Sequence, residues 1–263
     1  MRRDARCGLV AYITCGETGV EGTIDIALAL EAAGADVLEL GVPFSDPIAD
    51  GPVIQAASQR ALDRGTTMDD VMAIAAGIRA ASEIPLVAFS YLNPILRLGA
   101  EGFAERARSA GFDGVLVTDL PPESADEFCR TLRRHDLDPV FLVAPTSTPE
   151  RVRLADRHSR GFLYCVSTSG VTGARRELDP ALLDRLDALR PIVKNPIAVG
   201  FGVASNEQYR ALESRCDAVV VGSAIVRAIG DGDEAGAPGR AAAVVREILG
   251  RKASALATMS SRA

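Results

Sequence analysis

Eight short apolar runs, spaced almost evenly along the chain, are the feature that most restricts its fold. They occupy residues 8–14, 36–40, 85–91, 113–119, 138–144, 161–167, 195–201 and 217–223. Each run is nearly continuously apolar instead of alternating, which is typical of parallel strands buried on both faces. Amphipathic stretches with helical spacing lie between them, at residues 22–35, 53–65, 68–81, 123–135, 149–158, 180–190, 206–215 and 239–251.

This alternation predicts a (β/α)8 TIM barrel, an α/β fold with eight parallel strands. An open, doubly wound sheet is the alternative, but eight units in about 250 residues favour closure into a barrel. Because no linker interrupts the pattern, we expect residues 1–263 to form a single domain with its core at about 8–250. Residues 230–239 indicate a surface loop, and residues 253–263 indicate a frayed, disordered tail.

Charge and cysteine usage restrict the possible partners. The 263 residues carry a net charge of −6 and no Lys/Arg-rich run, so we expect no nucleic-acid partner. No apolar run approaches the roughly 18 residues that cross a bilayer, so we expect neither a membrane span nor a signal peptide. The five cysteines are scattered and lack a C-x-x-C pair, which is typical of reduced thiols and predicts a cytoplasmic protein without a zinc site.

The residues that finish each run matter most, because the active site of such a barrel forms at the C-terminal ends of its strands. The last three runs lead into glycine-rich turns, "STSGVTG", "GFG" and "GSA". Glycines let backbone N–H groups approach an anion, and a helix N-terminus adds a favourable dipole. Three such turns at one rim favour a phosphate site over ordinary tight turns, with Ser223 as an additional donor.

Four carboxylates follow strand ends and do not carry equal weight. Glu39 closes the second run, where lost hydration would raise its pKa and let it both donate and accept protons. A structural carboxylate bonded to its neighbours is an equally good interpretation of Glu39. By composition, Asp50 in "DPIADGP" is an Asp-Gly turn residue. Asp46 is interpreted as a cap or turn residue, and Asp119, before two prolines, is ambiguous in the same way.

Other catalytic groups are scarce. Both histidines, His135 and His158, fall on the helix side of their units, and we expect them to be solvated surface residues. No lysine falls inside a strand run, which argues against a Schiff-base aldolase. No His/Asp/Glu cluster indicates a metal. The residues alone therefore predict a metal-free barrel that uses carboxylates on a phosphorylated substrate.

One segment carries a strong family resemblance. "ELGVPFSDPIADGPVIQAASQRAL" (39–62) resembles the signature of the tryptophan synthase alpha subunit family. The similarity continues in "YLNPI", "DGVLVTDLPPE", "LVAPTSTPERV", "GFLYCVSTSGVTGAR", "AVGFGV" and "VVGSAIV". These motifs cover about residues 8–250 in the family's order, and the segment from Glu39 to Asp50 is the most specific of them.

The resemblance implies a lyase of tryptophan biosynthesis, which cleaves indole-3-glycerol phosphate to indole and glyceraldehyde 3-phosphate by a retro-aldol reaction. Glu39 matches the family's catalytic glutamate, the acid–base residue. Asp50 matches its catalytic aspartate, which accepts the indole N–H, so the resemblance reverses the turn interpretation. Thr172 matches a threonine that meets this aspartate when the site closes, and Tyr164 matches an active-site tyrosine.

The resemblance also implies binding residues. The positions that match the phosphate-binding residues are Gly173, Gly202, Gly222 and Ser223. The positions that line the family's indole pocket are Tyr12, Ile54, Phe89, Leu116 and Phe201. Two departures touch no catalytic group: Glu17 stands where the family commonly has an aspartate, and Thr118 where it has a proline.

The resemblance implies a partner as well. Members of the family bind a tryptophan synthase beta subunit in an α2β2 complex, so pyridoxal phosphate is expected only on that partner and no cofactor on this chain. The segments "SDPIADGP" and "YLNPI" retain the family's contact loops, which favours the complex. Two alternatives stay open: a stand-alone lyase that releases free indole, and a catalytically silent subunit that activates a partner. The pair Glu39 and Asp50 argues against the silent subunit.

Overall fold

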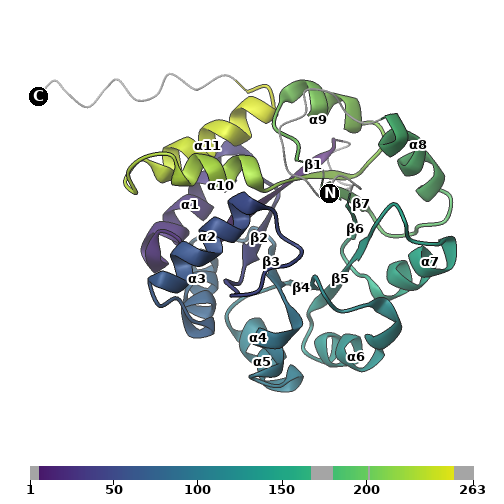
Figure 1. Cartoon of the computed structure of the whole chain (residues 1–263), viewed down its shortest axis with the longest axis horizontal. Helices are drawn as coiled ribbons and strands as arrows, with labels where there is room; N and C mark the ends of the chain where they lie inside the picture. The colour runs from purple at the N-terminus through teal and green to yellow at the C-terminus, as the bar shows by residue number, and fades with distance from the viewer. Residues whose placement is uncertain (1–5, 167–179, 201, 252–263) are drawn as a thin grey trace, which may run out of the picture.

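The computed structural model describes residues 6–166, 180–200 and 202–251. Eight parallel strands pair in sequence order, and β8 pairs with β1 to close the barrel. Figure 1 shows the helices as an outer ring around these strands. The closure confirms the predicted TIM barrel and excludes the open sheet. The strands are β1 (Gly8–Thr14), β2 (Val37–Gly41), β3 (Leu86–Ser90), β4 (Gly114–Val117), β5 (Asp138–Val143), β6 (Leu163–Val166), β7 (Ile197–Gly200) and β8 (Ala218–Val221).

Most helices lie where the amphipathic stretches predict them. These are α1 (Gly19–Ala33), α2 (Pro52–Asp63), α3 (Met68–Ala81), α6 (Asp126–Arg134), α7 (Pro149–His158), α8 (Pro180–Leu189), α9 (Asn206–Leu212) and α11 (Ala237–Ile248). The amphipathic stretches do not include α4 (Leu92–Leu96), α5 (Ala100–Ser109) or the short 3-10 helix η1 (Pro122–Ser124), and α10 (Ser223–Gly230) is the helix expected after the "GSA" turn. Helix α5 buries only Phe103, Ala104 and Ala107, and two small alanines give a weak periodic signal.

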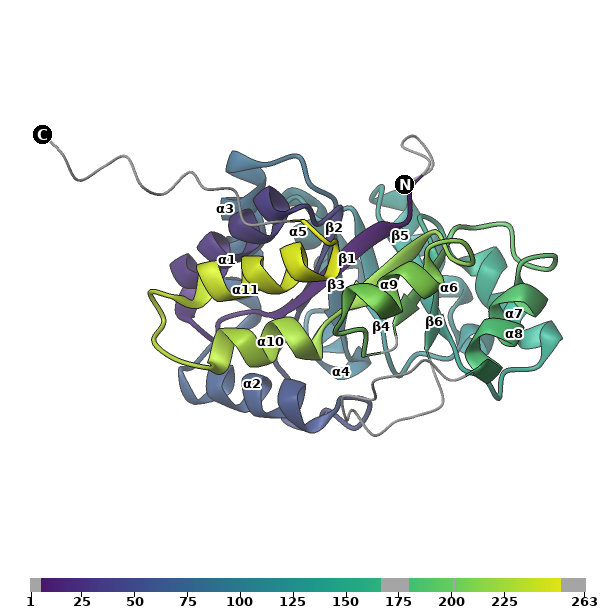
Figure 2. The ribbon, with the colours of Figure 1, turned by 90° about the horizontal axis from the view of Figure 1, so that it is seen from above.

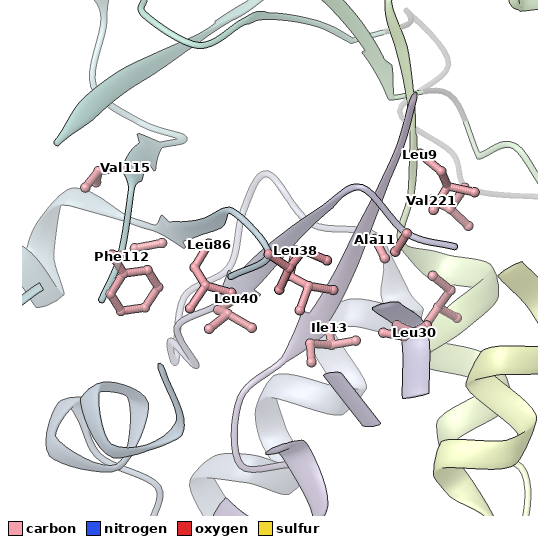
Figure 3. Packing of buried hydrophobic residues seen from close by; sticks show 14 of the residues in the cluster. Leu9, Ala11, Ile13, Leu30, Leu38, Leu40, Leu86, Phe112, Val115 and Val221 are labelled. Atoms are coloured by element: carbon pink, nitrogen blue, oxygen red, sulfur yellow. The ribbon is translucent and has the colours of Figure 1, made fainter. Parts of the chain in front are cut away.

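Two apolar layers hold the barrel together. Alternate strand residues point outward against the helices, as Figure 3 shows for Leu9, Ala11 and Ile13 of β1 with Leu30 of α1. The side chains on the other face of the strands fill the barrel interior. They form a cluster of Val10, Val37, Val87, Leu116, Val140, Phe162, Ala198, Ala218 and Val220. Every strand is thus apolar on both faces, which explains the continuous apolar runs.

Aspartates fix the N-terminal ends of several strands. Three carboxylates each accept a hydrogen bond from a backbone N–H in the first two residues of a neighbouring strand. The pairs are Asp36 with Leu9, Asp113 with Leu86, and Asp217 with Ile197. Each also pairs with an arginine; the Asp113–Arg79 pair is 2.7 Å long. These contacts set the register at the end of the barrel that lies away from the strand C-termini.

One histidine departs from the expectation. His158 is only 8% exposed, and its ring packs 5.6 Å from the ring of Phe141. The prediction of a solvated surface residue was therefore wrong for His158, because its ring packs against Phe141 of β5. His135 lies partly exposed beside Glu101, at 2.8 Å.

Candidate active site

Glu39 lies inside the barrel near the C-terminal end of β2. Its neighbours in register are Tyr12 of β1 and Val87 of β3. The residue is completely buried, and neither carboxyl oxygen has a hydrogen-bond partner among the described residues. Burial raises the pKa of the Glu39 carboxyl to about 8. At neutral pH the group is mostly protonated and can therefore donate a proton.

Unpaired buried carboxyl groups are costly, so this one needs an explanation. A structural carboxylate would have bonded to neighbouring N–H or hydroxyl groups, as Asp113 does in the same barrel. Glu39 has no such partner among the described residues, which favours the acid–base interpretation over the structural one.

Asp50 lies in the loop between β2 and α2, one residue before Gly51, the N-cap of that helix. The Tyr91 hydroxyl donates a hydrogen bond of 2.9 Å to its Oδ2 atom. The same hydroxyl accepts one of 2.9 Å from the backbone N–H of Ala49. Burial raises the pKa of the Asp50 carboxyl to about 6, while the bond from Tyr91 opposes that rise. Asp50 is thus mostly ionised at neutral pH and held in place by Tyr91, the residue after β3.

Tyr91 is the site residue that the sequence interpretation missed. It stands in the quoted "YLNPI" motif, at the N-cap of α4, and 41 positions separate it from Asp50. No local pattern signals this contact, because it depends on two strand ends meeting in space.

The other two acids of the strand ends have local roles. Asp46 is exposed, and its Oδ2 atom accepts a hydrogen bond of 2.6 Å from the Ser45 hydroxyl, in agreement with its interpretation as a turn residue. Asp119 accepts a hydrogen bond of 2.7 Å from the backbone N–H of Leu92, which satisfies one donor at the start of α4.

Apolar side chains build a wall beside Glu39. The rings of Tyr12 and Phe89 meet edge to face, with centroids 5.2 Å apart. Ile54, from the first turns of α2, packs in the same cluster. Leu116 is fully buried and pairs in register with Phe89. The structure thus brings together four of the five residues expected to line an indole pocket.

Tyr164 of β6 faces the same interior from the opposite side of the barrel. Burial raises its pKa, and the nearby negative charges of Glu39 and Asp50 raise it further. A Cβ atom at Gly200 would overlap the Tyr164 hydroxyl, so the glycine gives the ring its room. The pKa of Tyr12 is likewise raised by burial and then by Asp50. Both tyrosines remain neutral hydroxyl groups that can donate hydrogen bonds.

The expected phosphate positions that the structure describes lie at the same rim. Gly222 is the N-cap of α10 and Ser223 is its first residue. A Cβ at Gly222 would lie 3.5 Å from that of Tyr12, which places this turn beside the apolar wall. Gly202, after β7, has a φ of 66°, a left-handed conformation that favours glycine. Thr172, Gly173 and Phe201 lie outside the described residues.

Two negative findings concern only the described part of the chain. No group of three or more His, Cys, Asp or Glu side chains there could hold a metal ion. Within the same residues, no helix has the length and apolar character needed to span a membrane.

Comparisons with known proteins agree with this site. The sequence model of the family described as "Tryptophan synthase alpha chain" matches residues 1–253. The tryptophan synthase alpha chain of Solibacter usitatus is 47% identical over 237 residues, which cover 90% of this chain and 89% of the relative. That of Alkalilimnicola ehrlichii is 48% identical over 257 residues, 97% of this chain and 93% of the relative.

A solved structure shares both the sequence and the fold. A chain from the tryptophan synthase α2β2 complex of Pyrococcus furiosus superposes with a TM-score of 0.88 at 40% identity. The match covers 92% of this chain and 98% of that one. With its closed barrel, its buried glutamate and these relatives, the chain belongs to the tryptophan synthase alpha chain family.

Proposed function

We propose that this chain is a carbon–carbon lyase that cleaves indole-3-glycerol phosphate to indole and glyceraldehyde 3-phosphate in tryptophan biosynthesis. The observation that carries the proposal is the carboxyl of Glu39, fully buried and without a hydrogen-bond partner among the described residues, beside an aromatic wall. Membership of the tryptophan synthase alpha chain family supports it.

Glu39 is the proposed acid–base residue. Cleavage requires a proton on C3 of the indole ring and removal of the proton from the hydroxyl on the adjacent glycerol carbon. With a pKa of about 8, Glu39 starts protonated and can donate to C3. The resulting carboxylate can then take the hydroxyl proton while the carbon–carbon bond breaks and the carbonyl of the aldehyde forms. The residue therefore returns to its starting state in one turnover.

Asp50 is the proposed electrostatic partner. Protonation of C3 leaves a positive charge that is shared with the indole nitrogen. An ionised Asp50 would accept the indole N–H and stabilise that charge, more strongly in a site that excludes water. Tyr91 fixes the carboxylate through the 2.9 Å hydrogen bond and opposes the rise of its pKa, so that it stays charged at neutral pH.

The remaining site residues would bind the substrate. Tyr12, Ile54, Phe89 and Leu116 supply an apolar surface for the indole ring. The backbone N–H groups at the start of α10 and the Ser223 hydroxyl are suited to the phosphate. Tyr164, and the residues known only from the resemblance, Thr172, Gly173 and Phe201, complete the proposed set.

We further propose a tryptophan synthase beta subunit as the partner in an α2β2 complex, with pyridoxal phosphate bound only there. Ile48 and Leu96 are the two strongly exposed large apolar residues of the described chain, 85% and 57% exposed. Ile48 lies in the loop that carries Asp50, and Leu96 is the last residue of α4, the helix that begins after Tyr91. A partner that covers this face would remove both from water. The similar chain from the Pyrococcus furiosus α2β2 complex supports this assignment.

A cytoplasmic location is part of the proposal. The free thiols of all five cysteines support it, since a reducing compartment keeps thiols in this form.

Indole release from indole-3-glycerol phosphate, measured with and without a beta subunit, tests the function. Strong activation by the beta subunit is expected, whereas high activity of the chain alone would indicate a stand-alone lyase. Asp50→Asn should cripple cleavage while sparing phosphate binding, and Asp46→Asn, in the same loop, is the matched control when both are assayed without the beta subunit. A lack of indole under both conditions would refute the lyase and leave the silent subunit.

A further inference from the structure

A large basic hollow opens at the end of the barrel opposite Glu39. Its volume is about 820 Å³, and it lies where α6 and α7 meet the segments that lead into β6 and β7. The helices α6, α7 and α8 follow one another around the ring in Figure 1, and Figure 2 also shows α7 and α8 side by side. Because the strands are parallel, the segments before β6 and β7 share the edge formed by the strand N-termini, so none of the proposed catalytic residues lines this hollow.

Cations from four segments converge on the hollow. They are Arg133, Arg153, Arg157, Arg160 and Lys194. Arg133 is held in place, because its Nη2 atom donates a hydrogen bond of 2.9 Å to the carbonyl of His158 at the end of α7. Arg153 pairs with Glu150 at 3.8 Å, and the charges of Arg160 and Arg133 act on the carboxyl of Asp138. Arg157 and Arg160 are exposed, and neither lies within ion-pair distance of a carboxylate of the described residues.

The lining holds one acid, Asp156, beside five cations, which leaves a formal surplus of positive charge. Asp156 is buried, and its carboxylate accepts hydrogen bonds from the backbone N–H groups of Lys194, at 3.0 Å, and Asn195, at 3.1 Å. The Asn195 side chain adds a third, at 2.9 Å. These donors contact both carboxylate oxygens and fix the segment before β7.

Such a concentration of positive charge is unusual in a chain with a net charge of −6. Solvated surface arginines normally alternate with acids, as Arg210 does with Glu213 at 3.1 Å. In the hollow four arginines and one lysine line a single concave space, where like charges repel and a bound anion would relieve the repulsion. Guanidinium groups bind phosphate and carboxylate oxygens in pairs, which suits them to this role.

We propose that this hollow, named here the basic hollow and defined by the five cations above, binds a small organic oxyanion with at least two negative charges. Its volume matches a metabolite, since ligand pockets span roughly 300–1,000 Å³. The partly exposed Ile192 and the neighbouring Pro191 add an apolar wall for the uncharged part of such a ligand. The site is independent of the proposed lyase reaction and goes beyond it.

Calorimetric titration of the full chain with two probes tests the site, with pyrophosphate for the phosphate class and citrate for the carboxylate class. We expect at least one probe to bind, and to bind more weakly as salt rises, because charge drives the contact. The tighter probe identifies the class. Binding of neither probe at low salt would overturn the proposal.

Two matched variants locate the binding. Arg157→Gln with Arg160→Gln should weaken the tighter probe by about tenfold or more, since each removes a charge-assisted contact. Arg108→Gln with Arg246→Gln removes the same charge from α5 and α11, outside the hollow, and should leave the affinity unchanged. Equal weakening in both variants, or none in the first, would refute the site. Thermal unfolding followed by circular dichroism confirms that both variants fold.

Discussion

Replacement of Glu39 by glutamine should separate catalysis from stability. The carboxyl is completely buried without a hydrogen-bond partner among the described residues, and burial raises its pKa from 4.5 to about 8. Between these two values the unfolded chain releases the proton, but the folded chain keeps it. The folded state then binds more protons, so the free energy of unfolding falls as the pH rises from 4.5 to about 8.

The size of this effect follows from the pKa difference. Each unit corresponds to about 1.4 kcal/mol, which gives an upper limit of about 5 kcal/mol for Glu39 over the whole window. Glutamine has nearly the same shape and cannot ionise. Near pH 4.5 the variant and the wild type should have similar free energies of unfolding, and above pH 8 the variant should be more stable by several kcal/mol.

Urea denaturation followed by circular dichroism at both ends of the window measures this difference. Indole release on the same samples should fall by about a hundredfold or more, because the acid–base group is lost. Glu105→Gln, which replaces an exposed carboxyl on α5, is the control and should change neither quantity. Parallel pH dependence of stability in wild type and Glu39→Gln would refute the raised pKa, and near-normal turnover would refute the catalytic role.

Three further substitutions probe the site and the core. Tyr91→Phe removes the donor to Asp50, which should raise the pKa of that carboxyl above about 6 and lower kcat/KM by about 10- to 100-fold; an unmoved acid limb of the pH–rate profile would contradict this. Phe103→Ala should lower the free energy of unfolding by about 3–5 kcal/mol, since the ring is fully buried, and urea denaturation measures it. Gly200→Ala places a methyl group on the Tyr164 hydroxyl and should cost about 1–3 kcal/mol, with a rise in KM; unchanged stability and KM would show that the interior has spare room.

The sequence predicted the barrel well because its physical cause is local and repeated. Each strand is buried on both faces, so continuous apolar runs mark all eight of them. Helix α5 was not predicted because Ala104 and Ala107 occupy its core positions, where larger apolar residues would have produced a clear helical periodicity. His158 was misjudged because its burial depends on Phe141, which comes from a strand and not from its own helix.

The residues of the site differed in how much of their role the sequence could predict. Position alone placed Glu39 at a strand end, but its lack of a partner among the described residues is visible only in the structure. Asp50 could not be told from a turn residue without the family resemblance. Tyr91 could not be connected to Asp50 at all, because a hydrogen bond between two loops leaves no periodic trace in the chain.

That hydrogen bond has a mechanical consequence. The Tyr91 hydroxyl joins the end of β3 to the loop after β2, since it contacts both Ala49 and Asp50 at 2.9 Å. Because this hydrogen bond lowers the pKa of Asp50, that pKa depends on the distance between Tyr91 and the loop after β2. A partner that rests on Ile48, which is exposed in the loop after β2, would press on the loop that carries this hydrogen bond. Assembly could then set the charge in the active site without touching the substrate.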